Sequence, residues 1–148
     1  MSEYHTSVLL DESVSALVGS ADGVYADATF GGGGHTAEIL SRLSLNGSVL
    51  AFDRDMDAIG NRIDDPRLTL IRSDFRWIHN HVIHQGYGEG IDGVLADLGV
   101  SSHQFDTAER GFSFRYEAPL DMRMNQEADF NAADIVNSYE QEDLERIL

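Results

Sequence analysis

The chain has 148 residues, of which 42% are hydrophobic, so it is long enough for one domain, or for one domain and the start of another. It has no cysteine, which excludes a disulfide framework and a thiolate metal site. Its formal net charge is −16 and every basic residue is arginine, which argues against broad, non-specific binding of nucleic acid. Two explanations of the acidity stay open: adaptation to a salty cytoplasm, or a basic part of the protein that lies elsewhere.

The sequence shows no segment of the kind that enters a membrane. No apolar run approaches the length of a bilayer span, and residues 1–5 lack the basic start of a secretion signal. We therefore expect a cytoplasmic protein without a membrane partner.

Apolar runs and helical patterns alternate between residues 11 and 98. The runs predict strands at residues 24–29, 48–53, 68–71 and 91–98. Helical spacing predicts a short helix capped by Asp11, and further helices at residues 35–43, 56–63 and 75–84. Strands that alternate with helices pair in parallel through right-handed crossovers, so we expect an α/β fold with a doubly wound sheet in the strand order 3-2-1-4.

The character of the chain changes after Val100. Residues 101–115 are polar and rich in turn-forming residues, and residues 132–148 have a helical pattern that reaches the last residue without a cap. The fourth strand would form an open, apolar edge of the sheet, where doubly wound sheets normally continue. We therefore predict a partial nucleotide-binding-type domain at residues 1–105, the truncated start of a helical domain at residues 106–148, and more sequence beyond.

Four consecutive glycines, Gly31 to Gly34, stand between the first predicted strand and the helix that follows it. Glycines at such a turn let backbone N–H groups approach a ligand without an intervening side chain. This is how nucleotide-like cofactors are held at the carboxyl edge of a parallel sheet. An ordinary flexible loop is the alternative explanation.

Three predicted strands end in or beside an aspartate: Asp27, Asp53 and Asp97. The carboxyl ends of parallel strands meet at one edge, so we expect these carboxylates to line one crevice. Asp53 follows the glycine loop by about 20 residues, the spacing at which an acidic residue binds ribose hydroxyls. The alternative for Asp53 is a helix cap, because Asp55 and Asp57 also precede or open a helix.

The cofactor is either a dinucleotide or S-adenosylmethionine. The dinucleotide fingerprint requires glycine where this chain has Thr36, so that fingerprint is broken. The loop has no lysine or arginine for a pyrophosphate, whereas a crevice lined by carboxylates complements a sulfonium cation. The sequence therefore favours the methyl donor. Phe75, after the third strand, either lies on the adenine or is a core aromatic.

Six blocks together resemble the N-terminal half of the bacterial 16S ribosomal RNA cytidine-N4 methyltransferases. They are His5-Thr6-Ser7-Val8-Leu9-Leu10-x-Glu12, Asp27-Ala28-Thr29-Phe30-Gly31-Gly32-Gly33-Gly34-His35, Asp53-Arg54-Asp55, Asp97-Leu98-Gly99-Val100-Ser101-Ser102, Glu109-Arg110-Gly111-Phe112-Ser113-Phe114 and Pro119-Leu120-Asp121-Met122-Arg123-Met124. The last three are highly specific to that family.

The resemblance implies a Rossmann-like class I methyltransferase that uses S-adenosylmethionine and acts on 16S rRNA in the small ribosomal subunit, with no metal. By resemblance, the residues that contact the methyl donor are Gly33, Gly34, His35, Asp53, Phe75, Asp97 and Gln104. Members of the family usually have proline where this chain has His103, so the loop that carries Gln104 is expected to be less rigid. Family members are also about twice as long, with a helical domain inserted after the fourth strand.

Methylation of a cytosine amine requires alignment of the nitrogen with the donor methyl group and an acceptor for an amine hydrogen. Asp97 is the predicted acceptor and hence the candidate catalytic residue; the alternative is that it serves the cofactor only. Val100 cannot stack on a base as an aromatic residue would. The flipped base would then be held by Phe105, Phe112 or Phe114, for each of which a core position is the alternative.

Other chemistry-bearing residues have two explanations each. Three arginines either contact RNA phosphates or form salt bridges to Glu109, Glu117 and Asp121; they are Arg110, Arg115 and Arg123. Three histidines are interpreted as a solvated helix face and not as metal ligands, because only two share a face; they are His79, His81 and His84. Competing functions are methylation of another substrate, a nicotinamide oxidoreductase, and an inactive fragment that binds the cofactor weakly.

Overall fold

The structure is a computed structural model that describes residues 9–147. These residues form two compact units that divide after Leu98. The first four residues of the block His5 to Glu12 therefore lie outside the described residues, as does Leu148. The functional domain boundary after residue 105 stays a prediction.

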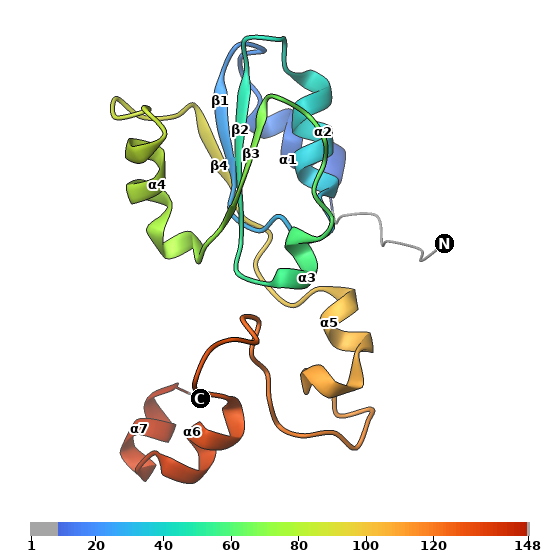
Figure 1. Cartoon of the computed structure of the whole chain (residues 1–148), viewed down its shortest axis with the longest axis vertical. Helices are drawn as coiled ribbons and strands as arrows, with labels where there is room; N and C mark the ends of the chain where they lie inside the picture. The colour runs from blue at the N-terminus through green and yellow to red at the C-terminus, as the bar shows by residue number, and fades with distance from the viewer. Residues whose placement is uncertain (1–8, 148) are drawn as a thin grey trace. The chain divides into compact units, whose positions relative to one another are not determined.

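The first unit is built on a four-stranded sheet in the order β3-β2-β1-β4, and all its pairs are parallel (Figure 1). The strands are β1 (Val24–Asp27), β2 (Ser48–Asp53), β3 (Leu68–Arg72) and β4 (Gly93–Leu95). Their helices are α1 (Leu10–Leu17), α2 (Gly34–Arg42), α3 (Met56–Ile59), the 3₁₀ turn η1 (Phe75–Trp77) and α4 (Ile78–His84). The predicted strand order and the doubly wound, Rossmann-like fold class are confirmed.

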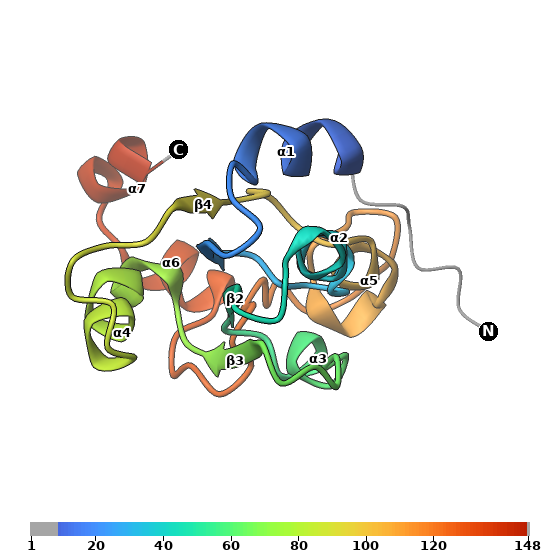
Figure 2. The same ribbon diagram turned by 90° about the horizontal axis from the view of Figure 1, so that it is seen from above.

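Side chains of the buried strands alternate between two apolar layers, as the two-residue period of a strand requires. On one face, Val49 and Ala51 of β2 pack in a cluster with α1 and α2. On the other face, Leu50 and Phe52 pack in a cluster with Val82 of α4. Figures 1 and 2 show α2 and α4 on opposite sides of the sheet. The inner strands β1 and β2 are therefore covered on both faces, whereas Val94 of the edge strand β4 is 50% exposed.

Several element boundaries differ from the prediction. The first helix begins at Leu10, so Asp11 lies in its first turn and forms an ion pair at 2.6 Å with Arg42 of α2; it does not cap the helix. Strand β4 spans three residues because its pairing with β1 ends at Leu95. Helix α3 ends at Ile59, where the backbone turns through Gly60. The helix predicted at residues 75–84 consists of η1 followed by α4.

The second unit contains four short helical elements: α5 (Ser102–Asp106), η2 (Ala108–Arg110), α6 (Ala132–Ser138) and α7 (Gln141–Ile147). The single helix predicted from residue 132 is wrong, because Tyr139 has an extended backbone that separates α6 from α7. A capping box between Asn131 and Asp134 begins α6. Among the described residues, no helix is both long enough and apolar enough to cross a membrane.

Two arginines hold the irregular segment between η2 and α6. The side chain of Arg110 is buried, and its guanidinium donates to the carbonyls of Arg123 and Met124 at 3.1 and 3.2 Å. Arg123 pairs with Asp121 at 2.7 Å, and the hydrogen bond from Arg123 holds the pKa of that carboxyl below its usual range. Arg123 thus forms the predicted salt bridge to Asp121, and the Arg110 guanidinium has a structural role through its bonds to main-chain carbonyls of the same segment.

Candidate active site

The glycine loop joins β1 to α2 at the carboxyl edge of the sheet. Gly31 and Gly33 have φ angles of 52° and 80°, in the left-handed region that favours glycine. A Cβ at Gly33 would lie 3.0 Å from the ring of the buried Phe30, so a side chain has no room there. Gly33 is also the N-cap residue of α2, and no side chain caps that helix. The first turn of α2 thus presents its main-chain donors at the edge of the sheet.

Strand register sets the three aspartates at two different levels of that edge. Asp27 is paired with Ala51 of β2 and with Leu95 of β4. Asp53, the last residue of β2, comes two residues after Ala51, which places it about 7 Å farther along the strand direction, and Asp97 lies two residues beyond the end of β4. Asp27 therefore lies below the rim of the sheet, and the other two lie at it.

Asp27 is fully buried beneath the glycine loop, so the expectation that it lines an open crevice is wrong. Its Oδ1 accepts the N–H of Thr29 at 3.0 Å, and its Oδ2 accepts the hydroxyl of Thr36 at 2.7 Å. Burial raises the pKa of the Asp27 carboxyl, and the hydrogen bonds from Thr36 and Thr29 act in the opposite direction. Asp27 thus ties together the residues on either side of the four glycines. Thr36, which breaks the dinucleotide fingerprint, has this structural role.

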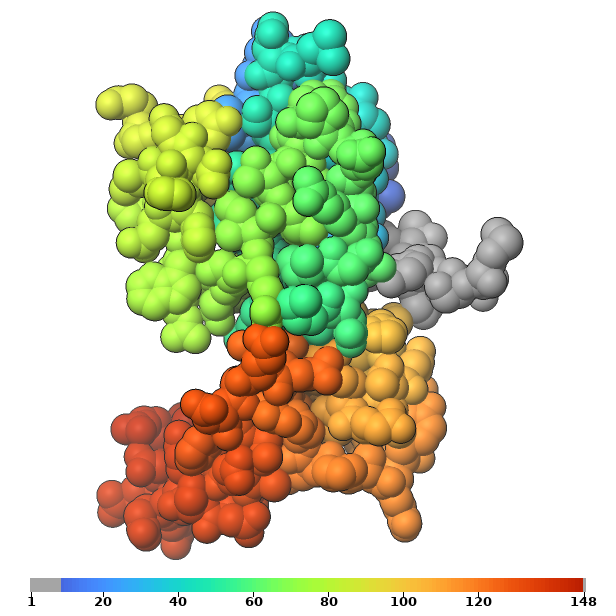
Figure 3. Space-filling view, in the orientation of Figure 1, coloured from blue at the N-terminus to red at the C-terminus, as the bar shows by residue number. Residues whose placement is uncertain are grey.

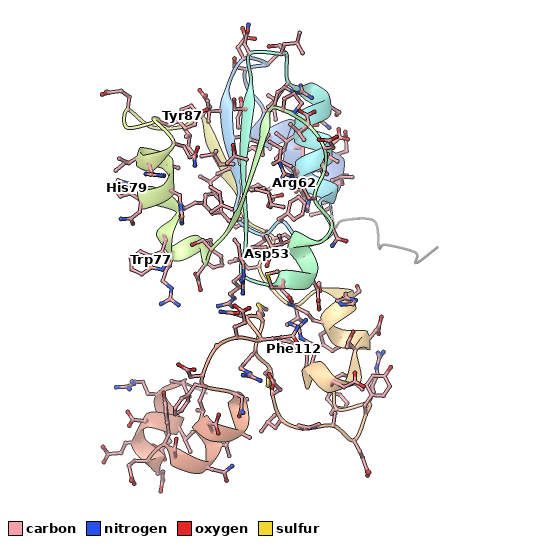
Figure 4. The ribbon with its side chains drawn as sticks, in the orientation of Figure 1. Asp53, Arg62, Trp77, His79, Tyr87 and Phe112 are labelled. Atoms are coloured by element: carbon pink, nitrogen blue, oxygen red, sulfur yellow. The ribbon has the colours of Figure 1, made fainter. Side chains whose placement is uncertain are left out.

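Asp53 lies at the end of β2 and contacts the glycine loop (Figure 4). Its Oδ2 accepts the N–H of Gly31 at 2.9 Å, and its Oδ1 accepts the N–H of Asp55 at 2.9 Å. The carbonyl of Gly31 accepts from the side-chain amide of Asn61 at 3.1 Å, so the loop is held on both sides. The cap of α3 is Asp55, whose carboxylate accepts the N–H of Asp57; the cap explanation for Asp53 is therefore wrong.

Asp97 follows β4, which pairs with β1 on the side opposite β2, and Asp97 is exposed. Its N–H donates to the hydroxyl of Thr29 at 2.8 Å. The first residues of the glycine loop are therefore bonded to Asp53 on one side and to Asp97 on the other. This brings together two of the predicted site residues and the loop in the first unit.

Phe75 begins η1 directly after β3, and its side chain is 44% exposed, so it is not the core aromatic of the alternative explanation. Asp74 caps η1 and accepts a guanidinium N–H of Arg54 at 3.0 Å, which links the ends of β2 and β3. Trp77, two residues on, is 53% exposed and was not singled out from the sequence (Figure 4). The segment that carries both aromatics and α4 forms one flank of the first unit in the space-filling view (Figure 3).

The remaining predicted cofactor residues are mostly buried. Gly33 and His35 are buried, and Gly34 is half-buried, so contacts from this turn would come from the main chain. Gln104 belongs to the second unit, where it is buried and forms a capping box with Ser101: its Oε1 accepts the Ser101 N–H at 3.0 Å. This capping box begins α5, and the expectation that the segment is less rigid than in relatives with proline stays a prediction.

The other candidates divide between structural roles and exposed positions. The ring of His81 packs against Phe52 with centroids 5.7 Å apart, and residues 9–147 contain no group of three or more histidines or carboxylates arranged to hold a metal ion. Phe112 is half-buried, with its ring centroid 5.9 Å from the guanidinium carbon of Arg110. Phe105 and Phe114 are exposed, so a core position is wrong for both.

Comparisons with known proteins identify the family to which the chain is similar. Residues 2–148 match the model of the MraW methylase family. The chain is 57% identical over 141 residues to "Ribosomal RNA small subunit methyltransferase H" of Bacteroides fragilis, which covers 95% of this chain and 46% of that protein. The proteins of the same name from Flavobacterium johnsoniae and Cytophaga hutchinsonii are 54% and 52% identical, over 98% of this chain and 48% and 49% of their own lengths. The chain thus spans about half the length of these curated relatives.

Proposed function

We propose, from the premise that the chain belongs to the MraW methylase family, that the whole protein methylates the N4 exocyclic amine of a cytidine in 16S rRNA, with S-adenosylmethionine as the methyl donor. The observation that carries this proposal is the glycine loop bonded between Asp53 and Asp97 at the carboxyl edge of the sheet. The names of the relatives support small-subunit ribosomal RNA as the substrate class. The proposed place of action is the cytoplasm.

Three features of the first unit support the methyl donor as the cofactor. The donor supplies an electrophilic methyl group on a sulfonium cation. The first turn of α2 has no side-chain cap, and it contains no acidic residue that would repel the donor's own carboxylate. Asp53 has further acceptor capacity for ribose hydroxyls beside its two main-chain bonds. The exposed ring of Phe75 offers an apolar surface to the adenine.

Asp97 is the proposed partner of the cytosine amine. As the amine nitrogen forms its bond to the methyl group, the bond from the donor sulfur to that methyl group would break and leave a neutral thioether. The nitrogen would gain positive charge and lose a proton to the Asp97 carboxylate. A carboxylate that accepts a hydrogen bond from the amine orients the nitrogen and stabilises that charge. The side chain of Asp97 is exposed at the rim, where an incoming base can reach it. Gln104, which forms the capping box with Ser101, stays a proposed contact of the methyl donor.

Calorimetric titration of the whole protein with S-adenosylmethionine and with its demethylated product tests the cofactor. Asp53→Ala is expected to weaken both affinities about 10- to 100-fold, the effect of losing hydrogen bonds to a charged group. Asp64→Asn changes another exposed carboxylate, between α3 and β3, and is expected to leave both affinities unchanged. Binding of a nicotinamide dinucleotide in place of the sulfonium compound would contradict the proposal.

Methyl transfer to small ribosomal subunits that lack the modification tests the acceptor. Nucleoside mass spectrometry is expected to show N4-methylated cytidine with the wild-type protein, and Asp97→Asn is expected to reduce the rate about 100-fold or more. Full turnover by Asp97→Asn would remove Asp97 from the catalytic role. Methylation of a different nucleoside, or of a protein, would reject the cytidine assignment.

A further inference from the structure

The pairing of β1 with β4 ends in an unusual way at Asp97. The two strands are in register from Tyr25 and Gly93 to Asp27 and Leu95, and the N–H of Ala28 continues the ladder to the carbonyl of Leu95 at 2.8 Å. In a regular parallel ladder, the next N–H donor of β4, that of Asp97, would return to the carbonyl of Ala28. It donates instead to the side-chain hydroxyl of Thr29 at 2.8 Å.

This change of partner occurs at the topological switch point of the sheet. The chain adds β2 and β3 on one side of β1, and then crosses to add β4 on the other side. The crevice between two strands at such a point is where doubly wound sheets bind their ligands. A bond to a side chain one residue farther along lets the chain after β4 leave β1 at this switch point while the N–H of Asp97 stays paired. The hydroxyl of Thr29, two residues after β1, thus holds the main chain of Asp97, two residues after β4.

The backbone of Thr29 is itself fixed from below. Its N–H donates to Oδ1 of Asp27 at 3.0 Å, and Asp27 is fully buried. The other carboxylate oxygen of Asp27 accepts the hydroxyl of Thr36 in α2 at 2.7 Å. A continuous set of hydrogen bonds therefore runs from the buried start of α2 through Thr29 to the exposed residue Asp97.

We propose that Thr29 is a positioning residue for Asp97, which rests on the proposed function because Asp97 is there the partner of the amine. The hydroxyl of Thr29 fixes the main chain at the point where the Asp97 carboxylate leaves the sheet. Asp97 is exposed, so water replaces the lost partner of its N–H when the hydroxyl is removed, and the fold loses little stability. Methyl transfer loses much more, because a displacement of about 1 Å in a reacting group can cost 10²-fold in rate.

Thr29→Val removes the hydroxyl and keeps the shape, Thr29→Ser keeps the hydroxyl, and Thr69→Val makes the same change at a half-buried position of β3. In the whole protein without cofactor, amide hydrogen exchange at Asp97 is expected to accelerate about tenfold or more in Thr29→Val only. Single-turnover methyl transfer is expected to fall about tenfold or more in Thr29→Val, and to stay within about threefold of wild type in the other two variants. The melting temperature without cofactor is expected to be similar in all of them.

A double-mutant cycle with Asp97→Ala identifies the route of the effect. Where Asp97 has no carboxylate to position, Thr29→Val is expected to change the rate by less than about twofold. An equal loss in both backgrounds, or unchanged exchange at Asp97 in Thr29→Val, overturns the proposal. A wild-type protein that neither binds S-adenosylmethionine nor methylates RNA overturns the proposed function instead, and the exchange measurement then still decides whether Thr29 holds Asp97.

Discussion

The packing of the glycine loop makes a quantitative prediction for Gly33→Ala. An L-residue in the left-handed region costs about 1–2 kcal/mol, and Gly33 has a φ of 80°. The new Cβ would also lie 3.0 Å from the ring of Phe30, which is 2% exposed and has little room to move, and 3.3 Å from Ile63. Overpacking of this kind costs about 1–3 kcal/mol. We therefore expect Gly33→Ala to lower the free energy of unfolding by about 2–5 kcal/mol.

Two further glycines separate the contributions. Gly86 has a φ of 93° and open space where its Cβ would lie, so Gly86→Ala measures the backbone term alone, about 1–2 kcal/mol. Gly19 has an ordinary φ and open space, so Gly19→Ala is expected to be neutral or stabilising by about 0.5 kcal/mol. Chemical denaturation of the whole protein measures all three, and calorimetry is expected to show weaker S-adenosylmethionine binding in Gly33→Ala only. A Gly33→Ala variant no less stable than Gly86→Ala would refute the crowding argument.

Three further predictions concern buried or paired polar groups. Thr36→Val removes a hydroxyl donor from the buried carboxylate beneath the loop, so denaturation is expected to show a loss of about 1–3 kcal/mol that Thr36→Ser largely recovers. Hydrogen bonds from Arg67 lower the pKa of Asp65 to about 2, so the stability from this pair is complete above the unfolded carboxyl's pKa of 3.8 and is lost as the pH falls to about 2. Melting temperatures measured across that interval are expected to fall less in Asp65→Asn than in wild type. Arg110→Met leaves two backbone carbonyls without a buried donor, so chemical denaturation is expected to show a free energy of unfolding of the second unit that is lower by about 2–3 kcal/mol. Arg115 is exposed, so Arg115→Met is expected to leave that free energy unchanged.

The strands of the sheet and their order could be predicted from the sequence, because they depend on local patterns. The apolar run at residues 48–53 forms a strand with the predicted bounds, since its side chains are buried on both faces. The end of β4 depends on its pairing with β1, which stops at Leu95, whereas the local apolar pattern predicts a strand as far as Leu98. Helix α3 likewise ends four residues early, at Ile59, although the apolar spacing continues to Ile63. Element ends are therefore the part that tertiary contacts decide.

The candidate site shows the same division. The sequence places Asp27, Asp53 and Asp97 at strand ends, but it contains no information on strand register. The register puts Asp27 level with Ala51, two residues short of Asp53, and this offset decides that Asp27 is buried while Asp53 reaches the glycine loop. In the sequence, Thr36 indicated only that the dinucleotide fingerprint is broken. Its position one turn into a helix beside a buried strand end could have suggested a hydroxyl partner for a carboxylate.

Main-chain N–H groups stabilise the Asp53 carboxylate at this edge of the sheet, whereas Asp97 is bonded to the loop through its own main-chain N–H and not through its carboxylate. Asp53 accepts main-chain N–H groups of Gly31 and Asp55, and the N–H of Asp97 is bonded to Thr29. Dipoles stabilise a carboxylate without neutralising its charge, so a cationic ligand still meets a negative rim. Both rim residues are bonded to the same three-residue stretch of the loop. A change in the loop backbone must therefore move Asp53 and Asp97 together, so a substitution that displaces Gly31 will affect cofactor binding and amine alignment at once.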